Sequence, residues 1–249
     1  MKTLSIIIPV YNEEATLQEL VEKVINLDLS SIWYTKEIVL VNDWSKDKSE
    51  EIIQTKLLNQ SKKDCEIKYV KNPKNSWKWY SLKNWFKNAT WDVMIVQDAD
   101  LEYFPEKDYI PMIKAYEENN ADFVYWSRTT WMKVFWNNYS TKAFKLWWLL
   151  VSRVTTILSF TKVTDEPTCY KMYDKKLKEY LILPPENWFE WEPAITMILL
   201  RKKFKYVEIP IHYHARAFEE WKKIKRQDWV KAILTLIKWR FKKINIEKK

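Results

Sequence analysis

The chain has 249 residues, of which 42 are basic and 33 acidic, and its formal net charge is +9. Its length allows one large α/β domain with a sizeable core. The charge favours an anionic partner without choosing between nucleic acid, a membrane surface and a phosphorylated substrate. The two cysteines, Cys65 and Cys169, lie far apart in the sequence, which excludes a disulfide framework and a cysteine metal site and favours a reducing, cytoplasmic compartment.

In the first half of the chain, segments rich in valine and isoleucine alternate with amphipathic segments. This is the pattern of βαβ units around a mainly parallel sheet. Strands are expected at residues 4–10, 37–41, 66–70, 93–97 and 122–125. A helix with Asn12 as its cap is expected after the first strand, and further helices are expected at 46–58, 80–88 and 106–119. The second half predicts helical sequence up to Phe160, then a strand at 168–173, a helix at 192–202 and a strand at 206–211.

The sequence predicts no membrane-spanning segment. The N-terminus lacks the basic region and the cleavable apolar stretch of a signal peptide. The most apolar window, residues 144–160, is short for a spanning helix and is interrupted by Lys145 and Arg153. We therefore expect any membrane contact to be peripheral.

The tail, residues 226–249, predicts a basic amphipathic helix that follows one domain of residues 1–225. Its apolar stripe consists of Val230, Ile233, Leu234, Ile237 and Phe241. Two interpretations stay open. Either the stripe packs against the domain, or the helix docks on anionic lipid.

Acidic side chains follow three of the predicted strands. They are Glu13, Asp43, Asp98, Asp100 and Glu102. Ligands of open α/β sheets bind beyond the carboxyl ends of the strands, so these carboxylates are expected to converge at one edge. Because gathered carboxylates repel each other, a Mg²⁺ or Mn²⁺ ion that bridges to a diphosphate would stabilise them. The alternative is a capping cluster for the helix predicted to begin at residue 106.

With their neighbours, these motifs resemble family 2 glycosyltransferases, and within them the dolichyl- or polyprenyl-phosphate mannosyltransferase-like branch. The resemblance covers nearly the whole chain. Its main segments are Ile8-Pro9-Val10-Tyr11-Asn12-Glu13, Val41-Asn42-Asp43-Trp44-Ser45, Gln97-Asp98-Ala99-Asp100-Leu101-Glu102-Tyr103, Tyr125-Trp126-Ser127-Arg128, Thr164-Asp165 and Tyr213-His214-Ala215-Arg216. Asn42 is a departure, because the family usually has an aspartate there.

The resemblance implies a GT-A fold and a role for individual positions. The implied contacts to the nucleoside are Pro9, Tyr11, Glu13, Asn42 and Asp43. The implied contacts to the diphosphate and the metal are Asp98, Ala99 and Asp100, with Glu102 as a further metal ligand. The implied phosphate-side cations are Arg128, Arg216 and Lys222, whose positive charges would stabilise the diphosphate as it leaves.

The resemblance also implies a reaction. Mannose from GDP-mannose or glucose from UDP-glucose would be transferred, with inversion, to a polyprenyl or dolichyl phosphate in the presence of Mg²⁺ or Mn²⁺. The protein is expected in the cytoplasm, or at the inner face of the plasma membrane if it docks there. No nucleic-acid partner is expected.

Three other functions are compatible with parts of the sequence. A hydroxyl acceptor on a cell-envelope saccharide would need a general base, for which Glu190 and Glu192 are candidates. A sugar-phosphate nucleotidyltransferase would need a glycine-rich, basic loop after the first strand. The segment Pro9-Val10-Tyr11-Asn12-Glu13 is not such a loop. The intact pair Asp98 and Asp100 argues against an inactive membrane adaptor.

The composition has one anomaly, since the chain contains no glycine and 16 tryptophans. Average usage predicts about 17 glycines, or ~7%, and turns need residues that reach positive φ. We interpret the pattern as a gene in which UGA encodes glycine but is here read as tryptophan, whereas Trp191 and Trp239 occupy aromatic positions of the family. The positions where the family has glycine are Trp44, Trp77, Trp79, Trp85, Trp91, Trp126, Trp188, Trp221 and Trp229.

Overall fold

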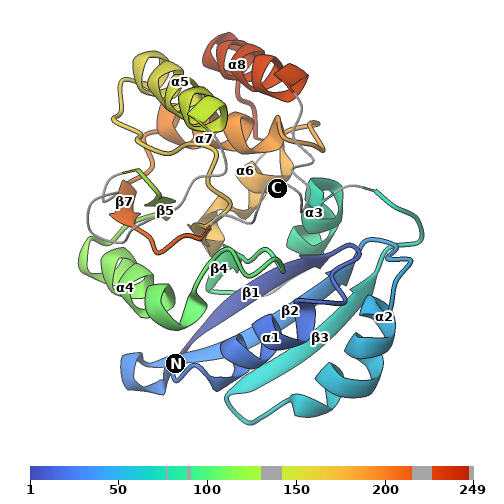
Figure 1. The fold of residues 1–249 in the computed structure, drawn as a ribbon. Coiled ribbons are helices and arrows are strands. Elements are labelled where there is room, and N and C mark those ends of the chain that lie inside the picture. The colour runs from blue at the N-terminus through green and yellow to red at the C-terminus, as the bar shows by residue number, and fades with distance from the viewer. Residues whose placement is uncertain (77, 89–90, 130–141, 215–225, 247–249) are drawn as a thin grey trace.

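The computed structural model describes residues 1–76, 78–88, 91–129, 142–214 and 226–246. Within them a seven-stranded sheet has the order β3-β2-β1-β4-β6-β5-β7 (Figure 1). The strands are β1 (Lys2–Val10), β2 (Tyr34–Asn42), β3 (Cys65–Lys71), β4 (Val93–Val96), β5 (Phe123–Ser127), β6 (Lys171–Asp174) and β7 (Tyr206–Pro210). Only β6 runs antiparallel to its neighbours β4 and β5, while the other pairs are parallel. The expected mainly parallel α/β sheet is confirmed.

Helices cover both faces of this sheet. They are α1 (Leu17–Asn26), α2 (Ser49–Ile52), α3 (Lys78–Asn88), α4 (Pro105–Glu118), α5 (Lys142–Ser159), α6 (Lys178–Ile182), α7 (Trp191–Arg201) and α8 (Arg226–Phe241), with short 3-10 turns at Ser30–Ile32, Leu58–Gln60 and Lys175–Leu177. Side chains alternate along each strand, so Ile6 and Ile8 pack with α1, α4, α5 and α8. Ile7 packs on the other face with α3, α6 and α7.

The helix after β1 begins at Leu17, so the expected cap at Asn12 is wrong. Asn12 has a left-handed backbone with φ 57°, which a residue entering a helix does not adopt. Its side-chain oxygen accepts a hydrogen bond from the Lys46 backbone N–H at 2.8 Å, and its own N–H donates to Ser45 Oγ at 3.1 Å. The side chain therefore joins two loops instead of capping a helix.

The helix after β2 is also shorter and less regular than expected. A continuous helix was predicted over residues 46–58, but α2 begins at Ser49 and passes into a π-helical turn, Ile53–Leu57. The residues before Ser49 belong to the loop that meets Asn12. A tertiary contact has therefore replaced the first helical turn.

In one interpretation, the predicted apolar stripe of the last helix packs against the domain. The structure turns another face of this helix inward. Its inner face is formed by Trp229, Leu236 and Trp239, which belong to the hydrophobic core. Four of the five residues of the predicted stripe are exposed, namely Val230, Leu234, Ile237 and Phe241, and Ile233 alone of the five packs partly against the core. The interpretation in which the stripe packs against the domain is therefore wrong. The boundary between residues 225 and 226 stays a prediction.

Two of the tryptophans, Trp33 and Trp44, have left-handed backbones with φ 64° and 68°. This conformation costs an L-residue with a Cβ roughly 1–2 kcal/mol, whereas glycine adopts it freely. By contrast, Trp126 is buried in the core, where its ring lies 4.3 Å from that of Tyr170. The Trp126 indole nitrogen is buried without a hydrogen-bond partner among the described residues, and the interpretation of Trp44 as a decoded glycine stays a prediction. Trp77 and Trp221 lie outside the described residues.

The tryptophan interpretation makes a measurable prediction at Trp44. Trp44→Gly is expected to raise the free energy of unfolding by about 1 kcal/mol, because glycine removes the left-handed strain. Trp191→Gly, at an aromatic family position in the core, is expected to lower it by about 3–5 kcal/mol. Urea denaturation compares the two variants, and the source gene should carry UGA at codon 44 and UGG at codon 191. UGG at codon 44 would remove the interpretation.

Candidate active site

The carboxyl ends of β2 and β4 lie on either side of the end of β1 (Figure 1). The Asp43 N–H, just beyond β2, donates to the Val10 carbonyl of β1 at 2.9 Å. On the other side, the Gln97 N–H donates to the Ile7 carbonyl at 2.9 Å. The chain that carries Asp43 and the chain that carries Asp98 therefore leave the sheet on either side of β1, and the convergence of their carboxylates stays a prediction.

Asp43 is a buried carboxylate held in one position. Its Oδ1 accepts hydrogen bonds from Asn72 Nδ2 at 2.7 Å and from the Ser76 backbone N–H at 2.8 Å. Its neighbour Asn42 is also buried, and its Oδ1 accepts from the Ser45 N–H at 2.9 Å. Asn42 therefore shapes the loop after β2, and Asp43 is the carboxylate that this loop orients.

The segment after β1 is bonded to the loop after β2. The Glu13 N–H donates to Ser49 Oγ at 2.9 Å, and the Glu14 N–H donates to Asp47 Oδ2 at 3.0 Å. In return, the Lys48 N–H donates to Glu14 Oε2 at 2.8 Å. These reciprocal bonds join the two loops into one rim, which carries the half-buried residues Pro9, Tyr11 and Glu13.

Gln97, the residue that follows β4, fixes the end of this strand. Its buried side-chain oxygen accepts from the hydroxyls of Tyr109, at 2.9 Å, and Tyr170, while its amide donates to the Asp98 carbonyl at 2.8 Å. The next residue, Ala99, is buried in the core. Asp98 and Asp100, the residues on either side of Ala99, have half-buried side chains. The end of β4 thus fixes the start of the turn that carries Asp98 and Asp100.

A chain of contacts connects Glu102 to the core. Tyr213 donates its hydroxyl to Glu102 Oε2 at 2.9 Å, and its ring lies 5.3 Å from the Arg128 guanidinium. Arg128 is buried and forms a bidentate ion pair with Asp165, with Nε–Oδ2 at 2.7 Å and the second N–O contact at 2.8 Å. The Trp148 ring covers the guanidinium at 3.6 Å. Arg128, the predicted phosphate-side cation, is thus linked to Glu102 through Tyr213, and Asp165 balances its charge.

Residues 5–181 match the family model described as Glycosyl transferase family 2. The chain belongs to glycosyltransferase family 2. The match spans β1 to α6 and so includes both loops of the rim and the Asp98-Ala99-Asp100 turn.

Two curated relatives share most of the length of this family 2 chain. It is 28% identical over 241 residues to the dolichol-phosphate mannosyltransferase of Pyrococcus furiosus, covering 95% of this chain and 64% of that protein. It is 26% identical over 220 residues to the undecaprenyl-phosphate 4-deoxy-4-formamido-L-arabinose transferase of Salmonella choleraesuis, covering 88% of this chain and 62% of that protein. The chain therefore spans less than two thirds of the length of these relatives.

A solved structure confirms the GT-A fold of this family 2 member. It is glucosyl-3-phosphoglycerate synthase from Mycobacterium tuberculosis, in complex with Mn²⁺, uridine diphosphate and glucosyl-3-phosphoglycerate. The TM-score is 0.62 at 16% identity, and the superposition covers 96% of this chain and 80% of that chain. At this identity the likeness carries the fold and no residue role.

The strand-end carboxylates of this family 2 member would need a phosphate of the substrate to complete a metal site. Among the residues that the structure describes, no three acidic, histidine or cysteine side chains gather closely enough to hold an ion by themselves. The oxygen donors Asp98 and Asp100 nevertheless fit Mg²⁺ or Mn²⁺, because such ions are commonly bound by one or two carboxylates together with substrate phosphates and water. A diphosphate would therefore complete this site.

Several predicted site residues are placed elsewhere or are not described. Arg216 and Lys222 lie outside the described residues. Glu192, a candidate base for a hydroxyl acceptor, is buried with its carboxylate 3.4 Å from Lys171 Nζ. Asp165 belongs to the family segment Thr164-Asp165, and the structure shows its role through its ion pair with Arg128.

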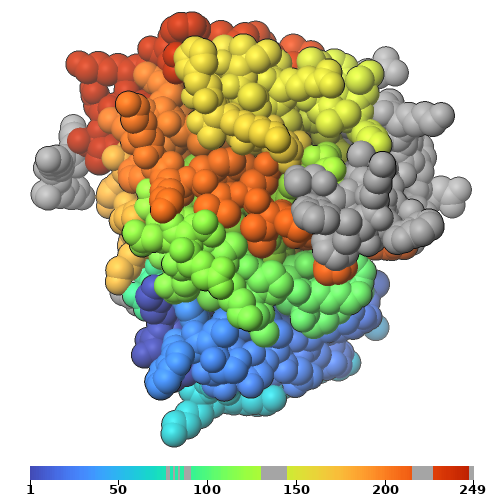
Figure 2. All heavy atoms as spheres, turned by 90° about the vertical axis from the view of Figure 1, so that its left-hand side faces the viewer, coloured from blue at the N-terminus to red at the C-terminus, as the bar shows by residue number. Residues whose placement is uncertain are grey.

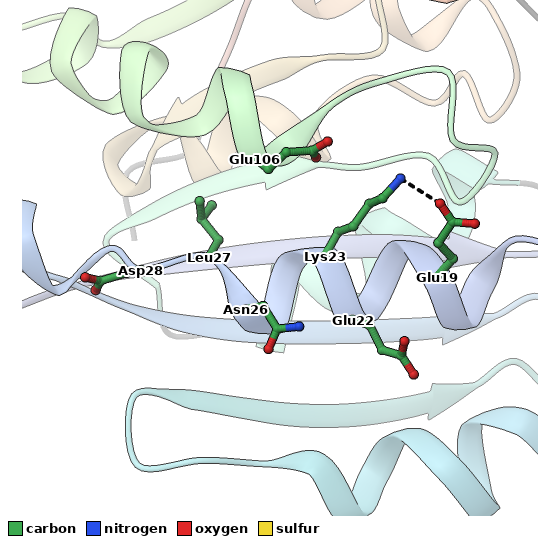
Figure 3. Close-up of a pocket in the computed structure, with 7 residues that line it drawn as sticks. All are labelled: Glu19, Glu22, Lys23, Asn26, Leu27, Asp28 and Glu106. Atoms are coloured by element: carbon green, nitrogen blue, oxygen red, sulfur yellow. Dashed lines mark ion pairs between the residues drawn. The ribbon is translucent and has the colours of Figure 1, made fainter.

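A hollow of about 440 Å³ lies between α1 and α4 (Figure 3). The side chains around it are mostly acidic and include the ion pair between Lys23 and Glu19, at 2.7 Å. None of the strand-end carboxylates lines it. The lining residues are Glu19, Glu22, Lys23, Asn26, Leu27, Asp28 and Glu106. This hollow is therefore separate from the rim.

The segment that leads to Tyr213 is anchored by Asp108. Its Oδ1 lies 2.6 Å from His212 Nδ1, and among the described residues its Oδ2 is buried without a hydrogen-bond partner. Burial raises the pKa of Asp108 to about 6 from 3.8, although the hydrogen bond from His212 acts in the opposite direction. The carboxyl group of Asp108 therefore binds a proton more tightly in the folded protein than in the unfolded chain.

This raised pKa predicts a loss of stability as the pH rises. The contribution of Asp108 to the free energy of unfolding should be fully present below pH 4 and fall by about 3 kcal/mol between about pH 4 and 6, then stay level. Asp108→Asn should remove this slope, and Asp64→Asn, at an exposed carboxylate, should keep it. Urea denaturation from pH 4 to 7 measures the difference, and parallel curves for Asp108→Asn and the unchanged protein would contradict the assignment.

Proposed function

We propose that this chain is a metal-dependent, inverting glycosyltransferase that transfers a hexose from a nucleotide-sugar to a polyprenyl or dolichyl phosphate. GDP-mannose and UDP-glucose are the leading donors. The observation that carries the proposal is the carboxyl edge of the sheet, where Asp43 and the pair Asp98 and Asp100 follow the strands on opposite sides of β1. Membership of glycosyltransferase family 2 supports this use of the rim.

The two sides of the rim suit the two halves of a nucleotide-sugar. Asp43 is a fixed acceptor, oriented by Asn72 and Ser76, and can receive hydrogen bonds from the base or ribose. Asp98 and Asp100 lie on the other side, where they would hold a divalent ion that neutralises charge on the diphosphate. The sugar would then lie beyond the diphosphate, facing the acceptor.

In the proposed reaction, an oxygen of the acceptor phosphate attacks the anomeric carbon from the face opposite the nucleotide. A new carbon–oxygen bond forms as the bond to the nucleoside diphosphate breaks, so one displacement inverts the configuration. An ionised phosphate needs no general base, whereas a hydroxyl acceptor does. The burial of Glu192 against Lys171 makes it a poor base for a hydroxyl acceptor and leaves Glu190 as the other candidate.

The names of the relatives support the acceptor class. Their names include dolichol phosphate and undecaprenyl phosphate, both of which are lipid phosphates. Among the helices that the structure describes, none is long and apolar enough to cross a membrane. We place the reaction at the cytoplasmic face of a membrane, which fits the free cysteines.

A donor screen tests this function. The chain, and a version with glycine restored at the family positions, would be incubated with GDP-mannose, UDP-glucose and related nucleotide-sugars, with Mg²⁺ or Mn²⁺. Release of the nucleoside diphosphate should depend on the metal and rise when polyprenyl phosphate is added. Polyprenol without phosphate is the matched control and should give no rise. Failure of both preparations to release nucleotide from any donor would overturn the transferase assignment.

A further inference from the structure

The chain that follows β7 lies against α4 and against the turn that precedes this helix. On the face of the molecule that Figure 2 shows, the orange residues of β7 and its continuation border the green helix α4, which contacts β7 (Figures 1 and 2). Tyr213 pairs with Tyr103 in an antiparallel bridge, and the His214 N–H donates to the Glu102 carbonyl at 3.0 Å. Residues 211–214, which we call the clamp segment, therefore lie directly on the turn that carries Glu102.

This turn has a backbone that needs support from outside. Leu101, between Asp100 and Glu102, has a left-handed backbone with φ 57°, a conformation that residues with a side chain avoid. Such backbones persist only where the surrounding structure holds them. The clamp segment holds this one twice, because it binds the Glu102 carbonyl through a backbone N–H and Glu102 Oε2 through the Tyr213 hydroxyl, at 2.9 Å.

Asp108 anchors the clamp segment to α4. Its Oδ1 lies 2.6 Å from His212 Nδ1 and accepts a hydrogen bond from the His212 backbone N–H at 3.4 Å. An oxygen that accepts the backbone proton can also accept a proton from the ring, so the contact is complete when Nδ1 carries the ring proton. Two bonds to one residue fix both its backbone and its side chain. The anchor therefore sets where along α4 the clamp segment lies.

The burial of Asp108 indicates a role other than stability. Asp108 is 3% exposed, and among the described residues its Oδ2 has no hydrogen-bond partner. A buried oxygen without a partner weakens a fold, so an apolar side chain of similar size would give the more stable protein. A carboxylate supplies direction instead, because its hydrogen bonds form only when His212 is in one position.

We propose that Asp108, acting through His212, is a positioning residue for the metal end of the donor site. A closed ring of contacts carries the effect. The ring runs from the Glu102 turn along the chain into α4 and crosses from Asp108 to His212. It then returns from Tyr213 to the Glu102 carboxylate. The inference rests on the proposed function, in which Glu102 contacts the ion that neutralises the diphosphate.

The same anchor also acts on the predicted phosphate-side cation. The Tyr213 ring lies 5.3 Å from the Arg128 guanidinium while its hydroxyl binds Glu102. A shift of the clamp segment would therefore move Tyr213 relative to both groups. The position of a predicted metal ligand and that of a predicted cation thus depend on one contact between α4 and the clamp segment.

Four variants test the anchor. Asp108→Leu and His212→Ala form the anchor-deleting pair. Asp108→Asn keeps an acceptor oxygen and His212→Asn keeps a donor near the place of Nδ1, so these form the anchor-keeping pair. Tyr116→Phe is the matched control, because it removes the hydrogen bond from Tyr116 to Asp174 at the last turn of the same helix.

Hydrogen exchange measures the anchor without any ligand. The His214 amide should exchange about tenfold faster in the anchor-deleting pair, since the loss of a hydrogen bond to a charged group shifts local opening by about that factor. Amides of β1 should keep their protection. If Asp108→Leu loses that protection, His212→Ala carries the test, because the His212 side chain is 29% exposed. Equal exchange of the His214 amide in all the variants and the unchanged chain would overturn the proposal.

Calorimetric binding of GDP and UDP, with and without Mn²⁺, connects the anchor to the site. The anchor-deleting pair should raise the Kd of the nucleotide with Mn²⁺ about tenfold, the lower end of the losses caused by residues behind a metal ligand. Binding without Mn²⁺ should stay within about twofold. The anchor-keeping pair and Tyr116→Phe should bind as the unchanged chain does. An equal loss with and without Mn²⁺ would contradict a positioning role, and so would unchanged Mn²⁺-dependent binding in the anchor-deleting pair.

Initial rates separate this inference from the proposed function. The anchor-deleting pair should need about tenfold more Mn²⁺ for half-maximal transfer, while kcat at saturating Mn²⁺ stays within about threefold. If exchange and binding follow the expected pattern but the unchanged chain transfers no sugar to polyprenyl phosphate, the proposed function fails and the positioning role stands. If the unchanged chain transfers sugar and every variant needs the same Mn²⁺ concentration, the positioning role fails and the function stands.

Discussion

Asp100→Asn is expected to lower kcat/KM for sugar transfer about a hundred- to thousandfold. The substitution keeps the shape of the side chain and an oxygen that can accept from the Glu102 N–H, a contact of 3.3 Å in the structure. It removes the negative charge, and with it the attraction for a divalent ion that stabilises the leaving diphosphate. The turn should therefore persist while the transition state loses its metal. Initial rates at several donor concentrations measure the effect.

The control for this experiment is Asp64→Asn, which neutralises an exposed carboxylate just before β3, at the amino ends of the parallel strands, whereas the site lies beyond their carboxyl ends. It should leave kcat/KM within about twofold, because surface substitutions of this kind rarely matter. A chelator should abolish transfer by the unchanged protein, and added Mn²⁺ should restore it. Full activity of Asp100→Asn with undiminished metal dependence would show that the ion is held elsewhere.

The strands and the acidic edge could be predicted because both depend on local sequence. Apolar runs followed at once by Asp43 and Asp98 identify buried strands with polar ends, and parallel pairing brings those ends together without any further information. Asn12 was placed wrongly because a helix cap and a loop contact use the same side-chain oxygen. Only the tertiary structure, in which the Lys46 N–H reaches that oxygen, decides between the two.

The last helix and the buried ion pair were beyond sequence reasoning for a different reason. The sequence of α8 contains two apolar stripes, one led by Trp229 and one by Val230, and periodicity cannot say which faces the core. Packing decides it here, since Leu236 and Trp239 fill the space beside α5 and α7. Arg128 likewise could be assigned as a phosphate-side cation, but its partner Asp165 is distant in sequence and is found only in the fold.

Asp165→Asn is expected to lower the free energy of unfolding by about 3–5 kcal/mol, since it leaves the Arg128 charge buried without its counter-ion. Burial by itself would lower the pKa of Arg128, but the charge of Asp165 holds that pKa above its ordinary value. The guanidinium therefore has no inexpensive neutral form. Glu19→Gln is the matched control, because its ion pair with Lys23 has the same 2.7 Å separation at exposed side chains. It should change stability by less than about 1 kcal/mol.

A double variant then separates the structural role of Arg128 from a catalytic one. Arg128→Met with Asp165→Leu replaces the pair by apolar side chains, and a buried pair replaced in this way costs little stability. Urea denaturation should show recovery of most of the loss caused by Asp165→Asn. If transfer also recovers, the guanidinium is not needed for transfer, and the Arg128–Asp165 pair has a structural role only. If the double variant is stable but transfers poorly with an unchanged donor KM, the guanidinium itself stabilises the leaving diphosphate, as the family resemblance implies.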